Sequence, residues 1–139
     1  MSALKDIRAA VETALAANAG ARALLGDPLR LAASRSRHLA FPHASWGRMT
    51  LLSRGAEGVD LTECRLTLDV WCRDGDAAAV TGQLRSILRD LSPVMPAGTV
   101  LMTLEPVYTD VFQTANPRIQ RGLVRLRVLT QQITEEVAP

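Results

Sequence analysis

The chain has 139 residues, 47% hydrophobic and 22% charged, proportions typical of a soluble globular protein with a sizeable core. Sixteen basic residues stand against fourteen acidic ones, so the formal net charge of +2 gives little drive toward bulk binding of nucleic acid. No apolar run approaches the ~18 residues of a membrane span, and charges between Lys5 and Glu12 interrupt the apolar stretch that a signal peptide requires. We therefore expect one domain over residues 1–139 that makes no membrane contact.

The N-terminal segment predicts a helix that runs to about Ala17. Its apolar residues recur on one helical face: Leu4, Ile7, Val11 and Leu15. The sequence "ARALLG" then predicts one more helical turn that ends at Gly26, since Pro28 cannot continue a helix. Residues 29–33 are expected to form a short strand.

A hairpin is predicted in the middle of the chain. Residues 43–52 follow Pro42, which favours extended neighbours, and are expected to form a strand. Glycines and charged residues fill the stretch 53–62 and indicate an exposed loop. A second strand, over residues 64–73, then pairs antiparallel with the first.

The second strand of this hairpin alternates between two faces and carries both cysteines of the chain. One face is apolar: Cys64, Leu66, Leu68, Val70 and Cys72. The other is mostly polar: Arg65, Thr67, Asp69, Trp71 and Arg73. The cysteines lie ~26 Å apart along a strand, too far for a disulfide or a shared metal ion. We expect two buried, reduced thiols; a metal site would require His38 or His43 to approach one cysteine, and no ligand-like spacing favours it.

The second half of the chain predicts a helix followed by two strands. Asp74 or Asp76 is expected to cap the helix, whose buried face comprises Val80, Leu84, Ile87, Leu88 and Leu91. Residues 99–112 predict a strand in which Pro106 requires an edge position or a bulge. The last strand, residues 121–133, is expected to point Val124, Leu126 and Val128 inward and Arg121, Arg125 and Arg127 outward.

The order of helix, strands, helix and strands is typical of an α+β fold. We expect a mainly antiparallel sheet of about four to five strands with two helices packed on one face.

No catalytic motif is recognisable in the chain. It has no glycine-rich phosphate loop, no histidines at helical spacing and no nucleophile elbow. Asp74 and Asp76 resemble a carboxylate pair but are interpreted as helix caps, and His38 and His43 as polar loop residues. Ser45 and Ser53 have no base near them in the sequence. We therefore expect no catalytic residue, no metal, no cofactor and no enzyme activity.

The outward side chains of two strands offer a candidate surface for assembly. It comprises Asp69, Trp71, Arg121, Arg125 and Arg127. Tryptophan and arginine are enriched at protein interfaces. The alternative is a solvated sheet face held by cross-strand ion pairs.

Four stretches resemble one known family when taken in order. They are "ARALLGD" after the first helix, "FPHASWG" before a strand, "LTLDVWCRDGDAAAVTGQLRSIL" and "RGLVRLRVLTQ". Together they are similar to the tail terminator, or tail completion, proteins of long-tailed phages and gene transfer agents. In "FPHASWG", histidine and alanine replace the tyrosine and valine usual in that family.

The resemblance implies a structural virion protein in the tail of a phage or phage-like particle, assembled in the bacterial cytoplasm. Such proteins form a ring, usually a hexamer, that ends polymerisation of the tail tube and joins the tail to the head connector, with DNA passing through the channel. The loop residues Arg54, Glu57 and Asp60 would then contact a neighbouring subunit or the tube protein. Two alternatives remain: another connector piece (stopper) or a tail tube subunit, and a small α+β enzyme or ligand-binding domain.

Overall fold

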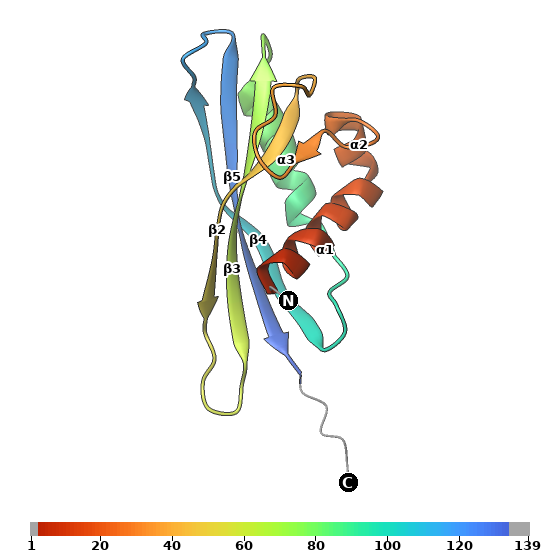
Figure 1. Ribbon diagram of the computed structural model, residues 1–139, viewed down its shortest axis with the longest axis vertical. Helices are drawn as coiled ribbons and strands as arrows, with labels where there is room; N and C mark the ends of the chain where they lie inside the picture. Colours follow the sequence, from red (N-terminus) through yellow and green to blue (C-terminus); the bar gives the residue numbers. More distant parts are fainter. Residues whose placement is uncertain (1–2, 134–139) are drawn as a thin grey trace.

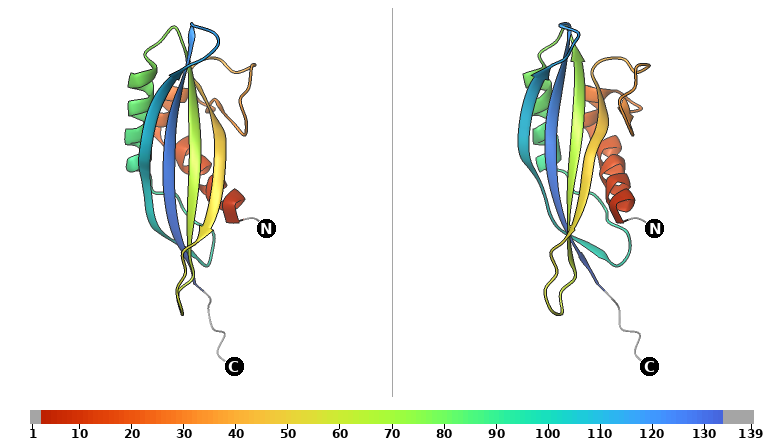
Figure 2. Two further views of the ribbon diagram at one scale, coloured as in Figure 1. Left: turned by 90° about the vertical axis from the view of Figure 1, so that its left-hand side faces the viewer. Right: turned by 60° about the vertical axis from the view of Figure 1, so that its left-hand side comes forward.

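Three helices cover one face of a five-stranded sheet in the computed structural model, which describes residues 3–133 (Figure 1). The helices are α1 (Ala3–Ala17), α2 (Ala19–Leu25) and α3 (Ala77–Arg89). The strands are β1 (Leu31–Ala32), β2 (His43–Ser53), β3 (Leu61–Arg73), β4 (Thr99–Gln113) and β5 (Ile119–Gln132). The α+β class and the helix layer on a single face agree with the sequence prediction (Figure 2).

The strands are arranged in the order β1-β2-β3-β5-β4. The pairs β2–β3, β3–β5 and β5–β4 are antiparallel, whereas the short β1 runs parallel to β2, so the sheet is mixed. Pro106 lies on β4, an edge strand, and the register shifts between Pro106 and Tyr108. Pro106 thus has both an edge position and a bulge beside it, either of which allows a proline within a sheet.

The number of helices differs from the predicted two. The turn expected after the first helix is a separate helix, α2, because Asn18 leaves the helical conformation at φ −88° and ψ 124°. Its side chain accepts a hydrogen bond from the backbone N–H of Ala21 at 2.9 Å, which satisfies one of the open donors of the new helix. Gly26 ends α2 at φ +93°, a conformation that favours glycine.

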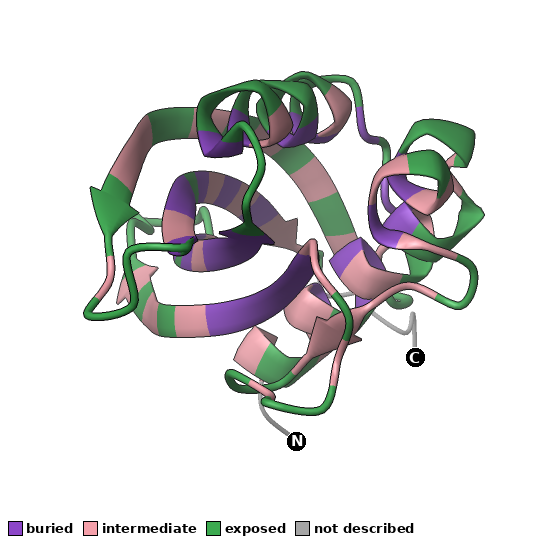
Figure 3. Ribbon diagram, turned by 90° about the horizontal axis from the view of Figure 1, so that it is seen from above, coloured by how far each residue is buried: buried purple, intermediate pink, exposed green. Residues whose placement is uncertain are grey.

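The core lies between the helices and the sheet, where the buried residues gather in Figure 3. Leu68 and Leu84 are fully buried there, and so is Cys64, while Cys72 is 3% exposed, which confirms the predicted apolar face of residues 64–73. Asp76 caps α3: its Oδ1 accepts a hydrogen bond from the N–H of Ala79 at 3.1 Å. None of the helices in the described part of the chain is long and apolar enough to cross a membrane.

Helix α3 approaches β5 closely at one position. A Cβ atom added at Gly122 would lie 1.9 Å from the Thr81 hydroxyl oxygen and 2.7 Å from a methyl carbon of Val70. Thr81 is itself buried and donates its hydroxyl to the carbonyl of Ala77 at 2.6 Å. Only glycine therefore fits beneath this turn of the helix.

Candidate assembly surface

The side of the sheet opposite the helices carries most of the predicted site. Side chains alternate along a strand, so the odd-numbered residues of β3 and of β5 up to Leu129 point away from the core. Their neighbours on β4 include Glu105, Tyr108 and Phe112. We call this surface the helix-free face.

One carboxylate on the helix-free face holds three arginines. Glu63 is only 3% exposed. Its Oε1 accepts a hydrogen bond from Nε of Arg127 at 2.6 Å, and its Oε2 accepts one from Nε of Arg65 at 2.8 Å, with Arg54 at 3.5 Å. The bond from Arg127, and then that from Arg65, lowers the pKa of Glu63 against the opposing effect of burial. This carboxylate is therefore ionised and fully engaged within the protomer.

A second polar cluster surrounds Trp71. Arg121 donates from Nε to Oδ1 of Asp69 at 2.8 Å, and the Trp71 indole N–H donates to the Ser45 hydroxyl at 3.0 Å. The guanidinium carbon of Arg35 lies 4.1 Å from the centroid of the Trp71 ring, and that of Arg121 lies 5.9 Å away.

Asp69 and Trp71 point away from the core, as predicted, but both are largely buried within the protomer. Asp69 is 6% exposed and Trp71 8%. Arg35, from the segment between β1 and β2, covers the indole from above, and Arg121 reaches over from β5. Both side chains therefore make several contacts within the protomer.

Arg125 differs from its two neighbours on β5. It is exposed, and it pairs with no carboxylate among residues 3–133. Its guanidinium carbon lies 5.1 Å from the centroid of the Tyr108 ring on β4, whose hydroxyl donates to Asp110 at 2.6 Å. Of the predicted arginines, Arg125 is the one with its charge still available to a partner.

The hairpin loop between β2 and β3 projects beyond the helix layer (Figures 1 and 2). All residues 54–60 are exposed, as predicted. Arg54 reaches back toward Glu63, and the carbonyl of Asp60 accepts a hydrogen bond from the N–H of Gln132 at 3.0 Å. Glu57 lies at the tip, between the bridged residues Ala56 and Val59.

His43 is not the polar loop residue that was predicted. It begins β2 and is 1% exposed, with its ring 5.0 Å from that of Phe41. Neither ring nitrogen makes a well-formed hydrogen bond with the described residues. Burial lowers the pKa of His43, and the charges of Arg35 and Arg30 lower it further, against the backbone carbonyl of Ala40.

The other candidate chemical groups do not converge. Asp74 pairs with Arg118 while Asp76 caps α3, so the two carboxylates do not act together. Within residues 3–133, no three histidine, cysteine or acidic side chains gather around a point where a metal could bind.

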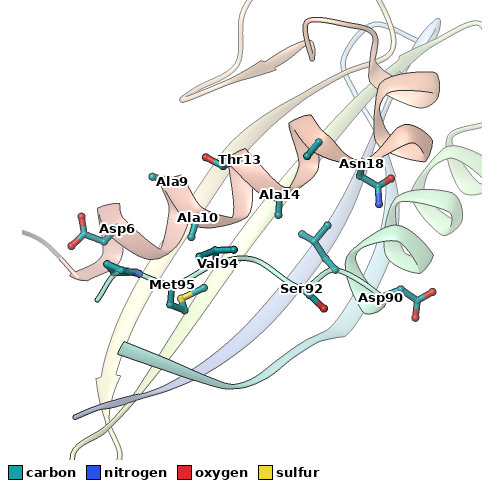
Figure 4. A pocket seen from close by; sticks show the side chains of 13 residues that line it. Asp6, Ala9, Ala10, Thr13, Ala14, Asn18, Asp90, Ser92, Val94 and Met95 are labelled. Atoms are coloured by element: carbon teal, nitrogen blue, oxygen red, sulfur yellow. The ribbon is translucent and has the colours of Figure 1, made fainter. Parts of the chain in front are cut away.

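A groove with a volume of about 610 Å³ lies between α1 and the segment 90–96 (Figure 4). Alanines of α1 and Met95 form much of its walls, and Asp6 and Asp90 lie toward its ends. Among the described residues that line it there is no histidine, cysteine or basic side chain.

These features define an α+β protein with a polar, arginine-rich sheet face. The family model of tail completion protein gp17 matches residues 9–131, and the chain belongs to that family. A comparison with curated protein sequences found no significant match. Among solved structures, the fold is similar to a chain in the virion of a native gene transfer agent particle, with a TM-score of 0.73 and 16% identity over 94% of this chain and 99% of that one. The resemblance noted in the sequence is thus confirmed, and the chain is a structural component of a phage or phage-like tail.

Proposed function

We propose that this protein is a tail terminator. Several copies, six by analogy with the family, form a ring at the head-proximal end of the tail tube. The ring ends tube polymerisation and presents a docking surface to the head connector or stopper, and DNA passes through its channel. The observation that carries this proposal is the match to the tail completion family over nearly the whole chain, together with a fold similar to that of a virion component.

The helix-free face is suited to line the channel or to border a neighbouring subunit. Its charges are largely balanced within the protomer, since Arg121 and Arg127 pair with Asp69 and Glu63. Binding of DNA strengthens with each phosphate that an unpaired cation neutralises. A surface whose arginines are already paired is polar but holds DNA weakly, as a passage for DNA requires. Arg125, at the centre of the face, would make the direct contact.

A particle lacking this protein tests the proposal. We expect deletion of the gene to give tails of uncontrolled length, or heads and tails that fail to join, by electron microscopy. A copy supplied in trans should restore normal particles. A stopper would instead leave tail length unchanged and release DNA from filled heads, whereas a tube subunit would abolish tails altogether. Normal particles from the deletion strain would refute all three assignments.

A further inference from the structure

Within residues 3–133 the sheet has two open edges. Strand β4 has only β5 beside it among the described strands. On the opposite side, β1 pairs with β2 only through Leu31↔Ala44 and Ala32↔Ser45. Residues 46–53 of β2 therefore have no strand beside them on that side within residues 3–133. Each edge presents unpaired backbone donors and acceptors, which are a template for adding a strand.

The proline and the register shifts that normally limit such pairing are confined in β4 to residues 101–108. The β4 edge contains no lysine or arginine, and five of its large apolar side chains are exposed: Val100, Met102, Val107, Tyr108 and Phe112. A long apolar edge of this kind is usually covered by a partner. Pro106 lacks an N–H, and the register of β4 shifts on each side of residues 103–106, so pairing is confined to the segments that flank the proline.

The charged residues of the two edge strands indicate which strand of a second copy pairs with β4. The only charged residues of β4 are Glu105 and Asp110, whereas β2 carries Arg48, is followed by Arg54, and contains no acidic residue. Pairing β4 with another β4 would bring carboxylates together, while pairing it with β2 brings opposite charges together. Leu51 on β2, 46% exposed, offers an apolar side chain to meet those of β4.

The directions of the strands also favour pairing of β4 in one copy with β2 in another. Three successive antiparallel pairs separate β2 from β4, so the two edge strands run in opposite directions. A rotation about an axis roughly along the strands preserves these directions, and β4 of one copy then meets β2 of the next antiparallel. Such a head-to-tail contact repeats from copy to copy and closes into a ring when the rotation closes.

We propose that the β4 edge of one copy adds to residues 46–53 of β2 in a second copy, forming one antiparallel sheet across the subunit boundary. This inference rests on the proposed function, to which it adds the surface through which the ring closes. The helix-free faces of neighbouring copies would then form one continuous surface.

Cysteine cross-linking tests the pairing. We expect a chain carrying both Leu51→Cys and Val107→Cys to give, on oxidation, a covalent ladder that ends at the ring size, in assembled particles and in solution. A mass-tagged mixture of the two single variants should give dimers containing one chain of each kind. Val94 is 87% exposed and lies beside the helix layer, away from both edges. Val94→Cys is therefore the matched control and should give no ladder. Both native cysteines are buried, so they should not contribute.

Three results would overturn the pairing: homodimers of Val107→Cys alone, which indicate that β4 pairs with β4; a ladder from the Val94→Cys control; or no cross-link in particles. Absence of a ladder together with the expected deletion phenotype would refute the edge pairing and leave the terminator role standing. A ladder together with normal particles from the deletion strain would refute the terminator role and leave the edge pairing standing.

Discussion

Arg127 on β5 stands directly opposite Arg65 on β3, and the repulsion between them is relieved by Glu63, which accepts a hydrogen bond from each. The carboxylate lies diagonally across from Arg127, within reach of its Nε at 2.6 Å. Like charges directly opposite each other destabilise a sheet, so this pair of arginines depends on the acid between them. Arg127 is therefore part of the protomer's own structure, which its sequence position alone does not reveal.

The first prediction is that Arg127 stabilises the protomer, whereas Arg125 acts in assembly or DNA passage. Arg127→Ala should lower the free energy of unfolding, because Glu63 is buried and loses its principal partner. Arg125→Ala should leave the unfolding midpoint unchanged but impair particle assembly or DNA passage. Denaturant titration of both variants, with particle counts by electron microscopy, measures the two effects. Equal unfolding midpoints for the two variants would contradict the distinction, and normal particles from Arg125→Ala would remove this residue from the proposed surface.

Local patterns predicted most elements of the fold, and long-range contacts explain what they missed. Period-two alternation identified β3 and β5, and the extended geometry that Pro42 favours indicated β2. Helical spacing identified α1 and the buried face of α3. The burial of Trp71 depends on Arg35, which lies 36 residues earlier (71 minus 35), and no local pattern encodes that contact. One missed signal was available: Gly122 inside a strand indicates a close approach of another backbone or helix, here Thr81 of α3.

The second prediction concerns the core. Leu84 is fully buried on α3, and Leu→Ala at such sites costs about 2–5 kcal/mol. Leu84→Ala should therefore lower the melting temperature markedly. Arg85→Ala, on the exposed side of the same helix, is the control and should change stability by less than about 0.5 kcal/mol. Similar effects for the two variants would mean that α3 packs through a different face.

The third prediction concerns the cysteines. Burial raises the pKa of Cys64 to about 11 and also raises that of Cys72. At pH 8 a thiol with a pKa of about 11 is ionised in roughly one molecule in a thousand, and the thiolate is the form that reacts. Thiol reagents should label both cysteines slowly in the native protein and rapidly in denaturant. Fast native labelling of both residues, or stoichiometric zinc by elemental analysis, would contradict this.

The fourth prediction is a dependence of stability on pH through His43. The folded state lowers the pKa of this histidine below its ordinary value of 6.5, so the unfolded chain takes up the proton first as the pH falls. The stabilisation is complete above pH 6.5 and is lost as the pH falls from 6.5 toward the folded pKa. Unfolding free energies measured at several values between pH 7.5 and 5.5 should decline for the native sequence. The decline should be smaller for His43→Leu, which removes the titrating group and fills a similar volume. An unchanged slope in this variant would assign the pH dependence to other groups.

The last prediction concerns the loop between β2 and β3. Residues 54–60 are exposed and project beyond the helix layer, and Arg54 and Glu57 offer cleavage sites to trypsin and to a glutamate-specific protease. We expect both proteases to cut the free protein there and to leave the loop intact in assembled tails, because a neighbouring subunit or the tube protein covers it. Arg85 and Arg89 provide the internal control, since they are exposed on α3 but held in a helix, where proteases cut slowly in either state. Glu57→Ala should abolish the glutamate-specific cut without changing the tryptic one, which verifies the site. If free and assembled protein are cut at the same rate, the loop is an ordinary solvent loop, and Arg54, Glu57 and Asp60 do not contact a partner.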